Sequence, residues 1–177
     1  ILQRVSVVGS SGSGKTWVAD QLGARLGVRH VELDAVFWQP GWTELPTEQL
    51  RQQVAAVLAT DSWVIDGNYT SRLGTMVLAA ADTVVWLDPP RRQLMAAVVL
   101  RTLDRGLRRR ELWNGNRESI RNVARWKPEE NIIRWAWVNH SGVRSRYEKL
   151  MENPAYAHIA WIRLRSRPAI NTWLNGL

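Results

Sequence analysis

The 177-residue sequence contains no cysteine, which excludes a disulfide framework and a thiolate metal site and is compatible with a reducing compartment. Long apolar runs are missing too, since the stretch LMAAVVL at residues 94–100 is too short to span a bilayer. No signal peptide precedes the first predicted strand. We therefore expect a cytoplasmic protein that binds no membrane. The length and the hydrophobic content of 45% predict one globular domain over residues 1–177.

Lysine and phenylalanine are scarce: three lysines stand against 21 arginines, and one phenylalanine against eleven tryptophans. GC-rich coding, which favours arginine and tryptophan codons, would explain this bias without any function. The arginines are clustered, however, because eight of them fall between Arg101 and Arg125 with only three acidic residues among them. Together with the net charge of +8, this cluster favours an anionic partner bound through guanidinium groups.

One short stretch, GSSGSGKT, concentrates glycine and serine directly after the apolar run VSVV. It fits the frame G-x-x-x-x-G-K-[ST] of a phosphate-binding loop, with the residues Gly9, Ser10, Ser11, Gly12, Ser13, Gly14, Lys15 and Thr16. A predicted strand at 3–8 and a predicted helix at 16–26 give the loop its usual setting. Backbone N–H groups would surround a nucleoside triphosphate, with Lys15 on its β- and γ-phosphates and the Thr16 hydroxyl on Mg²⁺.

Strands and helices alternate along the rest of the chain. Further strands are predicted at 28–33, 63–65, 83–87 and 158–164. Helices are predicted at 47–58 with Thr47 as cap, at 73–80, from about 91 into the arginine-rich segment, from Pro128, and from Pro168. The stretch AVFWQPGWTELP at 35–46 is predicted to be a loop. This alternation favours an α/β fold, a parallel sheet covered on both faces.

The strand ends separate the classes of phosphate-loop protein. The guanine signature N-K-x-D does not occur in the sequence. The strands ending WVID and WLD are followed by Gly67 and Pro89, not by a glutamate that could activate water. The sequence therefore favours phosphoryl transfer to an acceptor over hydrolysis.

These features together resemble the nucleotide-kinase branch of P-loop proteins, which includes adenylate and shikimate kinases. The resemblance rests on the phosphate-binding loop, the strand ends HVELD, VIDGNY and VVWLD, and the arginine-rich helix. The segments LDAVFWQPGW, WVIDGNY and ELWNGNRES resemble, more narrowly, bacterial topology modulation or adenylate-kinase-like proteins. The branch implies ATP and Mg²⁺ as cofactors, a five-stranded parallel sheet in the order 2-3-1-4-5, and an arginine-rich lid at about 101–127.

The resemblance also implies roles for two aspartates. Asp66 would be the Walker B acid, which holds Mg²⁺ through a water molecule. Thr16 would bind the same ion. Asp34 would face the acceptor, where a carboxylate can take the proton of a hydroxyl as the new bond forms. Asp88 precedes Pro89 and Pro90 and is interpreted as a cap.

Arginines of the lid would act as catalytic groups together with Lys15. Arg101 and Arg105 match the positions that grip the triphosphate in adenylate kinases, and Arg117 follows in the segment NGNRESIR. Closing arginines stabilise the charge that phosphoryl transfer spreads over the phosphate oxygens. The lid is expected to be mobile, with flexible points at Gly106, Asn114, Gly115 and Asn116. The loop that contacts adenine would contain Arg165, Ser166 and Arg167.

The acceptor side departs from adenylate kinases, because residues 31–50 contain no arginine or lysine to bind an acceptor phosphate. Trp38 and Trp42 could stack on a base or sugar. Aromatic residues after a strand, however, belong to a core at least as often as they contact a ligand. Asn68 and Arg72 complete the expected acceptor site with Asp34. AMP is not expected as the acceptor, which would instead be another nucleoside- or nucleotide-like molecule or a polyol, phosphorylated on a hydroxyl or phosphate.

Two other functions stay open from the sequence. A nucleic-acid-binding regulator would use Arg101 to Arg125 to follow phosphates and tryptophans to stack on bases. An ATP-dependent switch would show only residual hydrolysis. The three histidines are scattered, and none is predicted to be a ligand.

Overall fold

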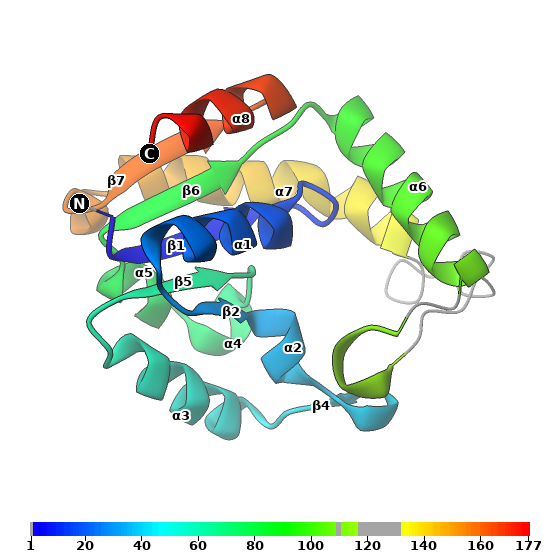
Figure 1. Cartoon of the computed structure of the whole chain (residues 1–177), viewed down its shortest axis with the longest axis horizontal. Helices are drawn as coiled ribbons and strands as arrows, with labels where there is room; N and C mark the ends of the chain where they lie inside the picture. Colours follow the sequence, from blue (N-terminus) through cyan, green and yellow to red (C-terminus); the bar gives the residue numbers. More distant parts are fainter. Residues whose placement is uncertain (1, 109–110, 117–131) are drawn as a thin grey trace.

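The computed structural model describes residues 2–108, 111–116 and 132–177. Five parallel strands form its main sheet, in the order β2-β5-β1-β6-β7 (Figure 1). Their bounds are β1 Arg4–Gly9, β2 His30–Glu32, β5 Trp63–Asp66, β6 Thr83–Leu87 and β7 Ala160–Leu164. The structure thus confirms the predicted α/β class and the parallel sheet.

The numbering of this order differs from the predicted 2-3-1-4-5, because the chain forms two short strands that the sequence does not predict. β3 (Trp38–Gln39) and β4 (Thr43–Glu44) pair antiparallel in a separate hairpin. The strand expected as the third of the sheet is therefore β5, which lies between β2 and β1.

Helices cover both faces of the sheet (Figure 1). α1 (Lys15–Leu26) and α8 (Arg167–Asn175) pack on one face, in a core that includes Val5 and Val7. α3 (Thr47–Leu58), α4 (Thr70–Leu73), α5 (Met76–Ala80) and α7 (Ile132–Glu152) pack on the other, in a core that includes Val8. Neighbouring strand residues point to opposite faces, which is why one strand supplies both cores. α6 (Arg91–Arg108) packs against α7.

Local structure differs from the prediction in three places. The expected loop at 35–46 contains most of helix α2 (Leu33–Phe37), the hairpin and a 3-10 turn, η1 (Pro40–Trp42). Pro46, not Thr47, stands at the N-cap position of α3, and no side chain caps that helix among the described residues. The helix expected at 73–80 is split into α4 and α5 at Gly74, whose φ angle is 59°.

The carboxyl ends of the central strands meet at one edge of the sheet. Asp66 is in register with Val7 of β1 and with Glu32 of β2, and Gly9 is in register with Leu87 of β6. In open parallel sheets, ligands bind at this edge.

The predicted lid lies only partly in the part of the chain that the structure describes. After α6, residues 111–116 include a 3-10 turn, η2 (Trp113–Gly115), and Arg117 and the rest of the lid lie outside the described residues. Within the described ranges, no helix is long and apolar enough to cross a membrane.

Candidate active site

The glycine-rich loop after β1 turns at its glycines, and Gly9, Gly12 and Gly14 have positive φ angles of 146°, 83° and 92°. A Cβ on Gly9 would lie 2.4 Å from the carbonyl oxygen of Leu87, and one on Gly12 would lie 2.4 Å from Cγ2 of Val98. Side chains at these two positions would push the loop away from β6 and α6. The loop thus has the strand–loop–helix geometry of a phosphate-binding loop.

Helix α1 begins at Lys15 and has Gly14 at its N-cap position. The Nζ of Lys15 donates a hydrogen bond of 3.1 Å to the carbonyl oxygen of Ser10, so the side chain folds back over the loop. The hydroxyl oxygen of Ser13 is buried and has no hydrogen-bond partner in the described part of the chain. A lysine beside a helix N-terminus is an arrangement that binds phosphate.

Lys15 lies among charges from several elements. Burial lowers its pKa, the carboxylates of Asp34, Asp66 and Glu32 raise it, and Arg101 lowers it, with a lowered pKa as the net result. The three acids and Arg101 therefore lie close enough to Lys15 to act on its charge.

The hydroxyl of Thr16 lies between two carboxylates. Its Oγ1 is 2.9 Å from Oδ2 of Asp66 and 3.2 Å from Oε1 of Glu32. Mg²⁺ prefers such oxygen donors and fills the rest of its shell with water and substrate phosphates. The oxygen donors of Thr16, Asp66 and Glu32 are of the type that Mg²⁺ prefers. The described residues hold no group of three or more His, Cys, Asp or Glu that could bind a metal by itself.

Glu32 is a member of this group that the sequence analysis did not assign to the metal. Burial raises the pKa of its carboxyl, whereas a hydrogen bond with the Trp113 side chain lowers it, and the pKa is raised overall. The signal in the sequence is the spacing of His30 and Glu32, because alternate residues of a strand share a face.

His30 is a second residue that sequence reasoning missed. Its Nδ1 lies 2.6 Å from Oδ1 of Asp20, and its Nε2 lies 2.9 Å from Oδ1 of Asp66. Burial lowers the pKa of His30, the hydrogen bonds with Asp66 and Asp20 raise it, and the net direction is upward.

Asp34 lies in the first turn of α2, where its Oδ1 accepts a hydrogen bond of 2.5 Å from the hydroxyl of Tyr69. Burial and the charge of Asp34 raise the pKa of Tyr69. The phenol therefore stays a donor and fixes one oxygen of Asp34. Tyr69 is the last residue of the segment VIDGNY, but the sequence analysis assigned no role to it.

Asn68, which is predicted to bind the acceptor, contacts the glycine-rich loop through its side-chain amide. Its Oδ1 accepts from the backbone N–H of Gly9 at 3.2 Å, and its Nδ2 donates to the carbonyl oxygen of Gly9 at 2.5 Å. The hydroxyl of Tyr147, in α7, donates to the same Oδ1 at 3.0 Å. These contacts hold the first residue of the phosphate loop, so they favour a positioning role for Asn68 over contact with an acceptor.

Arg72 lies near the expected acceptor side but is paired within the protein. Its guanidinium donates to Glu44 at 2.6 Å and to the hydroxyl of Thr47 at 3.2 Å, and it lies over the Phe37 ring. The positive charge on this side is thus balanced by an acid of β4.

Trp38 and Trp42 form a series of edge-to-face rings with Trp113. The ring centroids of Trp38 and Trp42 are 5.6 Å apart, and those of Trp42 and Trp113 are 6.3 Å apart. Trp38 also meets Phe37 edge to face at 4.9 Å. The rings pack on one another, with Trp38 and Trp113 half-buried and Trp42 exposed, so packing and acceptor contact are both compatible with the geometry.

The segment 111–116 is fixed on the hairpin region by two asparagines that the sequence analysis interpreted as flexible points. Asn114 donates to the carbonyl oxygens of Ala35 and Trp38, at 3.2 and 2.6 Å. Asn116, which is buried, donates to the carbonyl oxygen of Gln39 and accepts from the N–H of Trp42, both at 2.9 Å. The described part of residues 111–116 thus contacts the segment 35–42, where the acceptor site is predicted.

Of the three predicted lid arginines, the structure describes the side chain of only one. A guanidinium nitrogen of Arg101 donates to the Ser11 hydroxyl at 2.9 Å, which places this arginine on the phosphate loop. Arg105 belongs to α6, but its side chain is not among those described, and Arg117 lies outside the described residues.

The predicted adenine loop leads from β7 into α8. Ser166 caps α8 by accepting from the N–H of Ala169 at 3.3 Å. The guanidinium of Arg167 lies 3.8 Å from the ring centroid of Trp17, the residue after Thr16, and Arg165 lies 3.7 Å from Asp88. The loop therefore lies beside the start of α1.

Asp88 is the centre of an ion network, not the cap that the sequence suggested. It is buried, and it accepts from Arg144 of α7 at 2.9 Å and from Arg163 of β7 at 2.6 and 2.9 Å. Arg163 also pairs with Glu148 at 3.0 Å. The arginines come from distant parts of the chain, so no local pattern could have shown this network.

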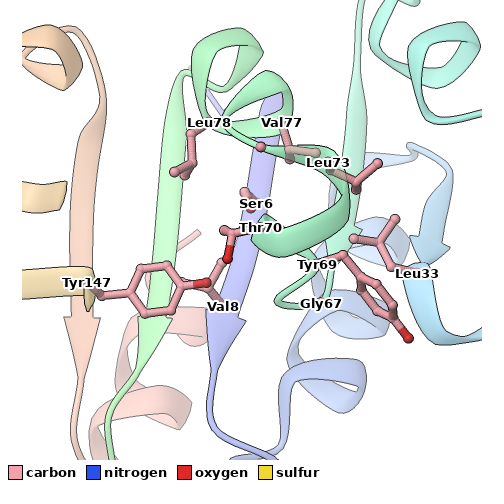
Figure 2. Close-up of a pocket in the computed structure, with 11 residues that line it drawn as sticks. Ser6, Val8, Leu33, Gly67, Tyr69, Thr70, Leu73, Val77, Leu78 and Tyr147 are labelled. Atoms are coloured by element: carbon pink, nitrogen blue, oxygen red, sulfur yellow. The ribbon is translucent and has the colours of Figure 1, made fainter. Parts of the chain in front are cut away.

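A small cavity of about 20 Å³ lies next to Tyr69, on the face of the sheet opposite α1. Figure 2 shows the side chains that line it, from β1, from the α4–α5 region and from α7. Its lining is mostly apolar and its size suits about one water molecule. It therefore does not serve as the substrate site, although Tyr69 lines it.

Comparison with known proteins supports the fold. A solved structure of shikimate kinase from Acinetobacter baumannii in complex with shikimate matches with a TM-score of 0.59 and 16% sequence identity. The match covers 99% of this chain and 90% of that chain. No family model matches the sequence, and the search of curated proteins found no match. The chain therefore shares the fold of that structure, and its membership of the kinase branch and the narrower resemblance to topology modulation proteins stay predictions.

Proposed function

We propose that this protein is a kinase that transfers the γ-phosphoryl group of Mg·ATP to a small acceptor. One observation carries the proposal: Thr16, next to Lys15 at the start of α1, contacts Glu32 and Asp66 at the ends of two strands, and Asp34 follows β2 in the first turn of α2. Phosphoryl transfer needs this combination of a phosphate cradle, a magnesium site and a carboxylate near the acceptor.

The glycine-rich loop would hold the triphosphate with its backbone N–H groups. Lys15 would leave the Ser10 carbonyl for the β- and γ-phosphates, and Arg101 would leave Ser11 for the same anion. Arg167 with Trp17 offers a stacking face for the base at the other end of the nucleotide.

Thr16, Asp66 and Glu32 would hold Mg²⁺ through their oxygens. When bound, the ion would offset the negative charge that develops on the phosphate oxygens during transfer. The buried Asp66 supplies one fixed carboxylate oxygen toward Thr16, and Glu32 supplies the second acid.

Asp34 would take the proton of an acceptor hydroxyl, with Tyr69 holding its other side. Glu44 balances Arg72 on the acceptor side, so hydroxyl groups suit this region better than a phosphate does. A nucleoside-like or polyol acceptor therefore fits best. Nucleic-acid binding rests mainly on arginines outside the described residues, and no contact within them favours it.

The test is a screen for products with Mg·ATP and pooled nucleosides, nucleotides, sugars and polyols, read by mass spectrometry. We expect a phosphorylated acceptor and ADP. Lys15→Ala should abolish product and the rise in melting temperature that ATP causes. Phosphate release without any phosphorylated acceptor would instead indicate a hydrolytic switch.

A further inference from the structure

A continuous line of hydrogen bonds runs along the α1 face of the sheet and ends at the proposed magnesium site. Thr16 and Asp20 lie one helical turn apart on α1, and His30 and Glu32 lie on one face of β2. Asp66 of β5 joins both pairs, through His30 at 2.9 Å and through Thr16 at 2.9 Å. Gly23 lets α1 approach this strand, because a Cβ there would lie 3.3 Å from Cβ of His30.

The two oxygens of Asp66 have different partners. His30 holds Oδ1, and Thr16 lies at Oδ2. The Asp66 side chain is only 2% exposed, so an oxygen without a partner would be costly there. The His30 ring thus satisfies one oxygen and turns the other toward the phosphate loop.

We propose that His30 is a positioning residue that presents Asp66 to the metal as a one-oxygen ligand. This inference rests on the proposed function. Mg²⁺ demands nearly octahedral geometry, whereas Ca²⁺ accepts carboxylates that bind through both oxygens. By holding Oδ1, His30 favours Mg²⁺ over Ca²⁺ at this site. Asp20 contacts the other ring nitrogen of His30. Because its side chain is 62% exposed, this contact contributes less to the orientation of the ring than the contact with the buried Asp66 does.

The test measures ATP binding by calorimetry in EDTA, in Mg²⁺ and in Ca²⁺. His30→Leu should bind metal-free ATP as the wild type does but lose about tenfold or more in Mg·ATP affinity, the usual cost of removing a residue that orients a metal ligand. Its preference for Mg²⁺ over Ca²⁺ should fall as well. His30→Gln keeps an N–H donor and should be intermediate, and Asp20→Asn should lose less than His30→Leu. His158→Gln, in an exposed turn, is the matched control.

Unchanged Mg·ATP affinity and unchanged metal preference in His30→Leu would overturn the proposal. If that variant does not fold, wild-type values in both His30→Gln and Asp20→Asn overturn it equally. An equal loss of metal-free and Mg·ATP binding would also overturn it, because His30 would then act on the loop as a whole. A wild-type protein that binds no ATP would contradict the proposed function itself, whereas failure of the variants alone leaves that function intact.

Discussion

At the scale of single residues, the two aspartates of the site should separate into two roles. Asp34→Asn should leave Mg·ATP affinity nearly intact and lower transfer by roughly a hundredfold or more, as for loss of a general base. Asp66→Asn should instead raise the Mg²⁺ concentration needed for half-maximal ATP binding. Calorimetry and initial rates measure the two effects. Loss of ATP binding in Asp34→Asn, with normal magnesium dependence in Asp66→Asn, would mean that the roles are reversed.

Asn68 should matter for nucleotide binding because its amide holds both backbone groups of Gly9. Asn68→Ala removes these bonds and should weaken ATP binding by about tenfold, since each buried hydrogen bond is worth about 1 kcal/mol. Tyr147→Phe removes only the bond from α7 and should have a smaller effect. Asn153→Ala is the control, because among the described residues the Asn153 side chain bonds to the nearby N–H of Ala155 and not to the loop. If Asn68→Ala binds ATP normally but loses acceptor affinity, the original acceptor prediction is right.

At the scale of elements, the asparagines of 111–116 should control how the lid closes. Asn116→Ala leaves the N–H of Trp42 and the carbonyl of Gln39 without this partner, so residues 111–116 should detach from the hairpin more readily. Trypsin should then cut near Arg108 to Arg110 faster than in the wild type. A non-hydrolysable ATP analogue with Mg²⁺ should slow that cleavage.

Asn171→Ala, at an exposed position in α8, is the control for general effects of an asparagine substitution on trypsin cleavage. Cleavage that is unaffected by the analogue, in wild type and variant alike, but slowed by single-stranded DNA would favour the nucleic-acid function instead.

The sequence predicted elements whose signals are local and missed contacts that only the fold creates. The strand–loop–helix geometry around residues 9–16 could be predicted from eight consecutive residues, and the strand at 83–87 has the predicted bounds. The hairpin β3–β4 was missed because its strands have two residues each, which is too short for any periodicity. His30 was missed because its partners Asp20 and Asp66 are separated from it by 10 and 36 residues.

At the scale of the whole molecule, the network at Asp88 should stabilise the fold, since it joins β6, α7 and β7. Replacing Arg144 and Arg163 together by Met leaves the buried carboxylate without these partners, and such losses cost about 3–5 kcal/mol. We expect a lower midpoint in urea with an unchanged slope. Asp61→Asn, at an exposed position, is the control. A double variant as stable as the wild type would show that the network contributes nothing to stability.

The edge-to-face tryptophans have an optical consequence. Trp38 and Trp42 belong to the hairpin region, and Trp113 belongs to the segment after α6, with centroids 5.6 and 6.3 Å apart along the series. Indole rings this close couple their strong electronic transitions, which gives a paired positive and negative signal in the far-ultraviolet circular dichroism spectrum. Separation of Trp113 from Trp42 would break that coupling. The chain therefore carries a label-free reporter of whether residues 111–116 lie against the hairpin region.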